Sequence, residues 1–408
     1  MMTDAGTAGR PRVLFLLNHA GRGGTERYVE LLVEGLVPAS MDAVLVYNED
    51  GPLRERLEAR GIRCIHLPMA SRFDRRAARR LAEICRMERI DVVHAMFLRE
   101  HYIAWLARLY GCRAARMATV HLMLEQPAGP PLVWLDRAVY RGMAGIVTVC
   151  DRLGVQMREA YGIAAGKLLT VHNGIAPDPL VPAVTVPGSF ADARREAVRP
   201  DREMIRAEFG IPADATVFLT AGRFTEEKGM GFLLNGIRAW PGGVPEGVRF
   251  LLAGDGALRA EVELAARTAG LSDRILFAGH RTDLPRLLHA ADAYVSPSRS
   301  EALSLSILEA MHAGLPVLAT DVGGTPEMVS PEKGTGLLVP YGDVGALAAG
   351  LARLASDAGL RASLGAVSNG LARTRFTLDI MLSRTLDAYR SVACGRQVSD
   401  DVRNIRAT

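Results

Sequence analysis

Short apolar runs rich in β-branched residues recur along the chain, separated by stretches long enough to form helices. They fall into two series, one before residue 173 and one after residue 215. Buried strands that alternate with helices indicate parallel sheets covered by helices. The runs are 13–17, 43–47, 91–94, 116–120, 145–149 and 167–172, then 216–221, 249–253, 275–278, 293–296, 316–319 and 336–339. The sequence therefore predicts an α/β protein with two doubly wound, Rossmann-like sheets.

The length of 408 residues also suits two domains rather than one core. Five prolines between residues 177 and 200, with no sustained period, predict a linker or surface insertion over 177–205. This boundary defines an N-terminal domain of residues 1–176 and a C-terminal domain of residues 206–375. Amphipathic patterns predict further helices over 346–354 and 381–393.

Composition excludes several classes of protein. The five cysteines are scattered and lack Cys-x-x-Cys spacing, which argues against a disulfide framework and a zinc site. Residues 1–12 are polar, without the apolar stretch of a signal peptide or membrane span, so we expect a cytoplasmic protein. A net charge of +4 is small for this length, and aromatic residues do not interleave the arginines, so we expect no nucleic-acid partner.

Two carboxylates, Glu301 and Glu309, stand eight positions apart in the second series. In a helix, eight residues rise about 12 Å and rotate the second side chain by about 80° from the first. Both carboxylates could then contact one elongated ligand at separate points. The pair lies between Ser296-Pro297-Ser298 and Gly323-Gly324.

A glycine-rich, charged loop directly follows the run 216–221 and contains Gly222, Arg223 and Lys228. Doubly wound sheets bind ligands at such strand ends, and guanidinium and ammonium groups suit phosphate oxygens. The alternative is an exposed loop in which Glu226 and Glu227 neutralise the basic residues, and the motif taken alone favours that alternative.

Gly23 and Gly24 lie between the first predicted strand and the following helix. Glycines there let backbone N–H groups approach phosphate, although many such loops are only tight turns. The spacing departs from Gly-x-Gly-x-x-Gly, so a nicotinamide-dependent enzyme loses its main support.

Together these motifs resemble the Glu-x7-Glu signature of family 4 retaining glycosyltransferases, which have the GT-B fold. Ser304 stands where glycine is commonest in that family. The resemblance implies two domains facing across a cleft, with acceptor binding in the N-terminal domain and nucleotide-sugar binding in the C-terminal one. It also implies a final helix, within about residues 376–408, that crosses back to the first domain.

The resemblance assigns roles to individual residues. Glu309 would bind the ribose hydroxyls and Glu301 the donor sugar, while Arg223 and Lys228 neutralise the diphosphate. His121, in a Thr-x-His element after a strand, would contact the donor sugar or the reacting centre, and His94 has a lower claim. The remaining donor-binding candidates are Gly23, Gly24, Gly222, Gly254, Gly279, His280, Leu303, Ser304 and Leu305, several of them acting through backbone atoms.

The implied activity is transfer of a hexosyl group from a nucleotide-diphosphate sugar to a sugar, lipid-linked or small-molecule acceptor. Cell-surface polysaccharide, glycolipid and secondary glycoside biosynthesis are the implied settings, and uridine or guanosine diphosphate sugars the usual donors. No Asp-x-Asp occurs, so we expect no metal and no cofactor. A nucleotide-sugar epimerase, a phosphorylase on the same fold and a non-catalytic nucleotide-sugar binding protein remain alternatives.

A run of arginines predicts a basic helix whose other face carries Phe73, Ala77, Leu81 and Ile84. A solvated helix that covers a sheet is the favoured interpretation. The other is attraction to anionic lipid head groups, and thus peripheral association at the inner face of a membrane. The arginines are Arg72, Arg75, Arg76, Arg79 and Arg80.

Overall fold

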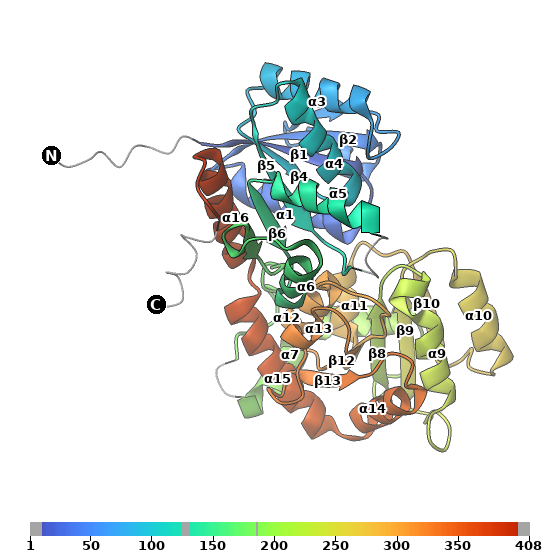
Figure 1. Cartoon of the computed structure of the whole chain (residues 1–408). Coiled ribbons are helices and arrows are strands. Elements are labelled where there is room, and N and C mark those ends of the chain that lie inside the picture. Colours follow the sequence, from blue (N-terminus) through green and yellow to red (C-terminus); the bar gives the residue numbers. More distant parts are fainter. Residues whose placement is uncertain (1–9, 125–129, 185–186, 399–408) are drawn as a thin grey trace. The chain divides into compact units, whose positions relative to one another are not determined.

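The computed structural model describes residues 10–124, 130–184 and 187–398. Contacts divide the chain into an N-terminal unit, up to Asn173 and again from Leu378, and a C-terminal unit, Gly174–Thr377. The first division falls three residues before the predicted one at 176. Each unit is an α/β body with a fully parallel sheet (Figure 1).

The sheet of the N-terminal unit has seven strands in the order β3-β2-β1-β4-β5-β6-β7. All six predicted strands are present, and β3 was missed because its side chains are half-buried or exposed at the sheet edge. The strands are β1 Arg12–His19, β2 Asp42–Glu49, β3 Arg63–His66, β4 Val92–Ala95, β5 Ala115–Val120, β6 Gly145–Thr148 and β7 Leu168–Thr170.

Helices follow most of these strands, which is why the sheet can be parallel. They are α1 Gly24–Leu36, α2 Pro52–Glu58, α3 Arg75–Met87, α4 Leu98–Ala107, α5 Pro130–Arg141 and α6 Asp151–Tyr161, with short 3₁₀ helices η1 Arg108–Tyr110 and η2 Ala165–Lys167. The last helix, α16 Leu378–Ala393, packs against α1, β4 and β5 of this unit.

The basic helix α3 has Ala77, Leu81 and Ile84 buried and its arginines turned outward. Asp74 caps its N-terminus by accepting hydrogen bonds from the backbone N–H groups of Arg76 and Ala77. Phe73 was expected on the apolar face. It precedes the helix instead and is 47% exposed, because the chain enters the helix only after the Asp74 cap.

The sheet of the C-terminal unit has six strands in the order β10-β9-β8-β11-β12-β13. All six predicted strands are present: β8 Thr216–Ala221, β9 Val248–Ala253, β10 Ile275–Gly279, β11 Ala293–Ser296, β12 Val317–Thr320 and β13 Gly336–Val339. From β8 onward this unit also contains the 3₁₀ helix η3 Glu226–Lys228 and the helices α9 Met230–Arg238, α10 Arg259–Thr268, α11 Leu284–Ala290, α12 Leu305–His312, α13 Thr325–Met328, α14 Val344–Ser356 and α15 Ala358–Arg375.

The predicted linker over 177–205 is wrong for most of its length. Residues 187–208 form two helices, α7 Pro187–Ala197 and α8 Arg199–Glu208, which pack on α15 and α11 of the C-terminal unit. Pro187 and Pro200 lie in the first turns, where the missing N–H has no helical partner to lose. The prolines therefore begin helices here and do not mark a flexible segment.

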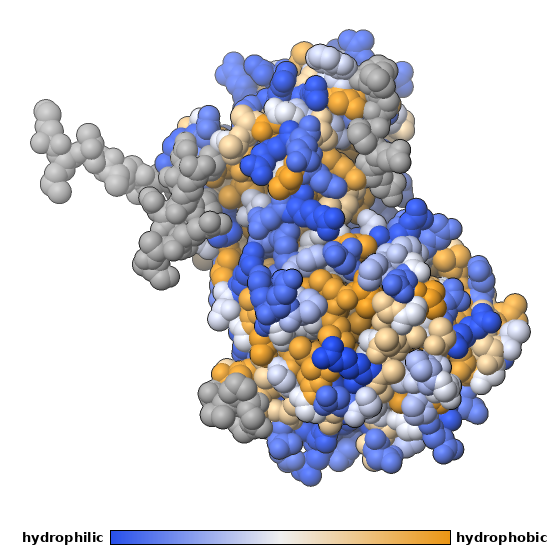
Figure 2. Space-filling view, turned by 60° about the horizontal axis from the view of Figure 1, so that its bottom comes forward, coloured by the Kyte–Doolittle hydropathy of each residue, from blue (hydrophilic) through white to orange (hydrophobic). Residues whose placement is uncertain are grey.

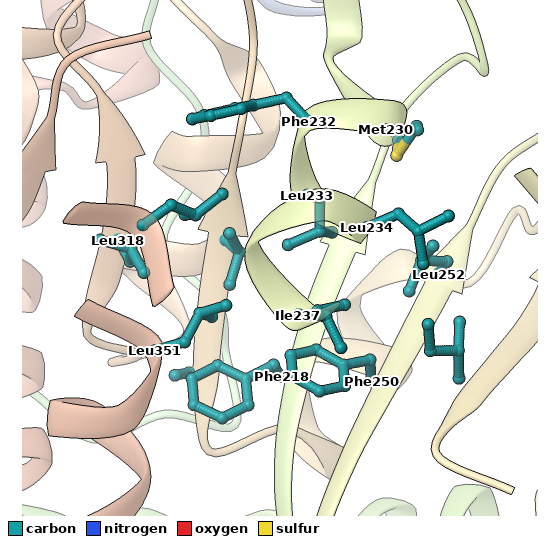
Figure 3. Close-up of a cluster of buried hydrophobic side chains, with 14 of the residues drawn as sticks. Phe218, Met230, Phe232, Leu233, Leu234, Ile237, Phe250, Leu252, Leu318 and Leu351 are labelled. Carbon is teal, nitrogen blue, oxygen red and sulfur yellow. The ribbon is translucent and has the colours of Figure 1, made fainter. Parts of the chain in front are cut away.

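Helix α9 packs its apolar face onto the C-terminal sheet (Figure 3). Leu233 and Ile237 of the helix belong to one buried cluster with Phe218 of β8 and Phe250 of β9, whose rings stack with centroids 5.3 Å apart. Burial of these side chains holds β8 and the loop that follows it in a rigid frame.

Within the described ranges, no helix combines the length and apolar character needed to cross a lipid bilayer. Hydrophilic residues are spread over the faces of both units seen in Figure 2, with hydrophobic residues between them.

Candidate functional site

In the C-terminal sheet, the chain runs outward from β8 to β10 and returns to place β11 beside β8. Crevices outside the carboxyl ends of the strands at such a reversal are where doubly wound sheets bind ligands. The loop after β8 carries Arg223 and Lys228, and the loop after β11 carries Glu301. The predicted residues therefore converge on the expected edge of this sheet.

Three glycines end the neighbouring strands β8, β9 and β10 at this edge. Gly222 donates its backbone N–H to Ala253 (3.0 Å), and Gly254 donates to Gly279 (2.7 Å). Gly254 has φ 135°, and a Cβ there would lie 1.8 Å from the carbonyl oxygen of Gly222. Only glycine fits, so the edge presents bare backbone that a ligand can approach closely.

Lys228 and Glu301 form an ion pair between the two loops. The Lys228 Nζ lies 2.6 Å from Glu301 Oε2, which also accepts a hydrogen bond from Ser298 Oγ at 3.3 Å. The lysine and glutamate side chains are 25% and 13% exposed, so ligand can still reach both.

The alternative in which neighbouring glutamates neutralise this loop does not hold for Lys228. Its carboxylate partner is Glu301, while Glu226 faces Arg299 at 3.9 Å. The Arg223 side chain is exposed and forms no ion pair with any residue in the described ranges. The Lys228 ammonium is thus held in place by an ion pair, and the Arg223 guanidinium is available to a ligand.

The geometry expected for Glu301 and Glu309 was partly wrong. Helix α12 begins only at Leu305, because the Ser304 side chain caps it by accepting from the Ile307 backbone N–H at 3.5 Å. Glu301 lies in the preceding loop and Glu309 on the helix, so a helical rise and rotation do not relate them. The helix N-terminus expected after Ser304 is present.

Tyr294 of β11 is hydrogen-bonded to the end of β8 and was not predicted from the sequence. Its buried hydroxyl donates to the carbonyl oxygen of Ala221 at 3.1 Å. Burial raises the pKa of Tyr294, and the negative charges of Glu309 and Glu301 raise it further. A tyrosine within a predicted strand has the pattern of an ordinary core residue, so the sequence does not mark it as part of a site.

Thr225 is a second residue that the sequence did not single out. Its Oγ1 is buried in the loop after β8 and lacks a hydrogen-bond partner among the described residues. Such an atom costs free energy until a ligand or water satisfies it.

The remaining predicted residues of this unit lie around the same edge. Gly279 ends β10 with φ 68°, and the exposed His280 follows it. Leu303 is buried beside the start of α12, and Leu305 is half-buried in its first turn.

In the N-terminal unit, His121 directly follows β5. Its ring meets Tyr28 edge-on at 4.9 Å, and its Nε2 is buried without a hydrogen-bond partner among the described residues. Burial lowers the pKa of His121 to about 3, helped by the nearby His101. The imidazole is therefore neutral at pH 7 and offers hydrogen bonding, not positive charge.

His94 has a structural role. It lies within β4, fully buried, and both ring nitrogens are bonded: Nδ1 to the Tyr389 hydroxyl at 2.7 Å and Nε2 to Thr119 Oγ1 at 2.6 Å. The histidine thus links β4 to β5 and to α16, and it has no ring nitrogen left for a ligand.

Gly23 and Gly24 lie at the start of α1, as expected. Gly23 is the N-cap with extended backbone and no side-chain cap. The buried carboxylate of Glu26, in the first helical turn, fills the space beside Gly23. The Glu26 carboxylate therefore already compensates the positive end of the helix dipole, which weakens the case for phosphate binding at this position.

Glu100, in the first turn of α4, was not predicted. Its side chain is fully buried, and neither carboxylate oxygen has a hydrogen-bond partner among the described residues. Burial raises the pKa of Glu100 to about 7. The adjacent His101 also has an unpartnered Nε2, and burial lowers its pKa to about 4. Unsatisfied polar atoms thus gather where β4 and β5 end.

Comparison with known proteins agrees with this architecture. A family model described as Glycosyltransferase Family 4 matches residues 22–179, and one described as Glycosyl transferases group 1 matches residues 215–357. This chain belongs to the family 4 (group 1) glycosyltransferases. The two matched regions cover most of the chain and lie one in each unit.

Two relatives of this family 4 chain illustrate the range of the group. The lipopolysaccharide core biosynthesis glycosyltransferase LpsD of Rhizobium meliloti is 35% identical over 48% of the chain, and the 2-deoxystreptamine glucosyltransferase of Streptomyces kanamyceticus is 31% identical over 62%. The matched part of the chain spans 55% and 65% of their respective lengths.

Among solved structures, Anabaena HepE in complex with UDP and glucose is similar over 92% of this chain and 98% of its own, with a TM-score of 0.77 at 19% identity. WaaG, a glycosyltransferase involved in lipopolysaccharide biosynthesis, is similar over 92% and 98%, with a TM-score of 0.70 at 17% identity. These likenesses establish the GT-B fold class.

Proposed function

We propose that this protein transfers a sugar from a nucleotide-diphosphate donor to an acceptor, with retention of anomeric configuration. The observation that carries the proposal is the Lys228–Glu301 pair at the β8/β11 reversal, between the bare backbone of Gly222 and Gly254 and the start of α12. The HepE structure, solved with UDP and glucose, supports a nucleotide sugar as donor.

The leaving diphosphate is stabilised by Arg223, Lys228 and the N-terminus of α12. The Arg223 guanidinium, the Lys228 ammonium, whose charge Glu301 partly offsets, and about half a charge from the helix act on the phosphate oxygens. Thr225 Oγ1 lacks a partner among the described residues and is free to donate a hydrogen bond to the same group. No divalent ion is needed in this scheme, so we propose a metal-independent reaction.

Glu301 and Glu309 bind the two sugars of the donor. Glu301 is held by Lys228 and Ser298, so its free oxygen is oriented to accept a hydroxyl of the transferred hexose. Glu309, one turn into α12, accepts the ribose hydroxyls.

Acceptor binding belongs to the carboxyl edge of the N-terminal sheet. His121 lies at the same edge, is neutral at pH 7 and provides a ring nitrogen for a hydroxyl of the donor sugar or of the reacting centre. A hydroxyl-rich acceptor agrees with relatives named as a lipopolysaccharide core biosynthesis glycosyltransferase and a 2-deoxystreptamine glucosyltransferase.

A nucleotide-sugar donor screen tests the proposal. Ligand that binds only the folded protein raises its unfolding temperature, so uridine, guanosine and adenosine diphosphate sugars are compared in a thermal-shift assay. We expect nucleotide sugars with one of these bases to raise the unfolding temperature. Adding an acceptor to the protein and that donor should then release nucleoside diphosphate.

Three outcomes would redirect the assignment. Donor binding without turnover would indicate a binding protein. An epimerised donor without release of diphosphate would indicate an epimerase, and phosphate-dependent cleavage of a glycoside would indicate a phosphorylase. Absence of stabilisation by every nucleotide sugar would refute the proposed site.

We further propose that α3 attracts the protein to anionic membranes. Its exposed Arg75, Arg76, Arg79 and Arg80 form one charged face, each residue worth about 1 kcal/mol near an anionic surface. Sedimentation with phosphatidylglycerol vesicles should decline for the variant with all four changed to Gln. Equal sedimentation of both proteins would leave α3 as a solvated helix.

A further inference from the structure

A small pocket opens on the edge of the C-terminal sheet opposite the candidate donor site. It has a volume of about 70 Å³ and lies at the amino ends of β11 and β12. Helix α7, the turns leading into the two strands and the first turns of α15 line it. The helix α7 lies in the segment whose prolines suggested a linker.

Three arginines line this pocket: Arg194 and Arg195 of α7 and Arg361 of α15. Arg194 is only 8% exposed, and its guanidinium donates to the carbonyl oxygens of Ala313 and Leu288. Arg361, half-buried, donates in the same way to Leu354 at 2.6 Å and to Ala355 at 3.0 Å. Carbonyl oxygens hold these two groups in position, and no carboxylate within the described residues forms an ion pair with either.

The one carboxylate in the lining, Asp292, is already engaged. One of its oxygens pairs with Arg202 at 2.8 Å and the other with Arg206 at 2.7 Å. The second oxygen also accepts the backbone N–H of Val217 at 2.9 Å. Arg194, Arg195 and Arg361 form no ion pair with residues in the described ranges, so the pocket has an excess of positive charge.

The arginines of the pocket differ from two neighbouring arginines that have a carboxylate partner. Arg202 and Arg206 also donate to carbonyl oxygens, but each has Asp292 as counter-ion. Burying a cation without a counter-ion is unfavourable, and burial lowers the pKa of Arg194 to about 10 and also lowers that of Arg361. An anion in the pocket would relieve this cost.

We propose that the pocket binds a tetrahedral oxyanion, either inorganic phosphate or the phosphoryl group of a small metabolite. Guanidinium groups present planar pairs of N–H donors that match phosphate oxygens. Drug-sized ligands and nucleotides occupy cavities of several hundred Å³, so a pocket of about 70 Å³ accepts a single phosphoryl group. A bound anion would join α7 to α15 and stabilise the C-terminal unit.

The experiment measures phosphate binding by the full chain at constant ionic strength, using calorimetry and thermal shift. Arg195→Gln and Arg195→Glu change the exposed arginine, and Arg361→Gln changes the half-buried one. Arg267→Gln, at an exposed arginine of α10 in the same unit, is the matched control. We expect the affinity for phosphate to fall about tenfold or more in the pocket variants and to stay unchanged in the control.

A second arm separates this pocket from the donor site. Phosphate affinity should survive in the Arg223→Ala, Lys228→Ala double variant, and nucleoside diphosphate should not compete. Inorganic phosphate and a hexose 6-phosphate are compared to identify the source of the anion. A site for the free ion binds inorganic phosphate only, whereas a site for a phosphoryl group binds both compounds.

The proposal is overturned if neither compound binds, if the pocket variants bind phosphate as tightly as Arg267→Gln, or if binding is lost in the donor-site double variant. None of these outcomes bears on the transferase assignment, which is tested with nucleotide sugars.

Discussion

Replacing Glu100 with Gln should change how the stability of this protein depends on pH. Glu100 is fully buried without a hydrogen-bond partner among the described residues, and its pKa is raised from 4.5 to about 7. Glutamine has nearly the same shape and carries no charge, so the variant removes the titration while keeping the packing.

The direction follows from proton binding in the two states. Between pH 4.5 and 7 the unfolded chain has lost the Glu100 proton while the folded protein still holds it, so the free energy of unfolding falls as pH rises. Below pH 4.5 both states are protonated, and above pH 7 both are ionised, so the contribution is constant outside this window.

The magnitude follows from the two pKa values. Their difference corresponds to about 3 kcal/mol at 1.36 kcal/mol per tenfold change in proton affinity. As the pH rises from 4.5 to 8, the free energy of unfolding of Glu100→Gln should therefore increase by about 3 kcal/mol relative to that of wild type. His94, His101 and His121 titrate in both proteins, so their effects cancel in the comparison.

Urea unfolding at intervals from pH 4.5 to pH 8 measures this difference. Glu159→Gln, at an exposed position of α6 in the same unit, is the control and should follow wild type throughout. A constant difference between Glu100→Gln and wild type across the range would refute the claim that Glu100 is buried as an acid without a partner.

Three further outcomes are expected. Transferase activity should survive excess chelator, while Arg223→Ala or Lys228→Ala lowers turnover by on the order of a hundredfold; loss of activity in chelator and its recovery with magnesium would contradict this account. Glu309→Ala should weaken binding of the nucleoside diphosphate in calorimetry by roughly 1.5 to 3 kcal/mol, and an unchanged affinity in a folded variant would exclude the ribose role. Tyr389→Phe leaves a buried nitrogen of His94 without its partner and should cost about 1 to 3 kcal/mol in urea unfolding, whereas a neutral effect would mean that water replaces the hydroxyl.

The sequence alone determined the class of fold and the segments that carry the site. Parallel strands buried on both faces require continuous apolar runs, and twelve such runs coincide with strands of the two sheets. Ligand-binding loops must follow the carboxyl ends of strands, so Gly222, Arg223 and Lys228 could be placed from their position in the chain.

Other features were decided by tertiary contacts. The strand β3 lies at a sheet edge with mixed burial, so its residues lack the apolar run that marks a central strand. The prolines of residues 177–200 are compatible with both a linker and helix first turns, and only packing against α11 and α15 selects the helices.

Pairing at the site also depends on the fold. Lys228 is next to two glutamates in the sequence but bonds to Glu301, 73 positions away, because β8 and β11 are neighbours in the sheet. His94 and His121 both follow the same local pattern near strand ends. The fold buries one between Tyr389 and Thr119 and leaves a ring nitrogen of the other without a partner among the described residues. Local sequence sets backbone preference and position, whereas the partner of a charged or polar side chain depends on which distant segments the sheet brings together.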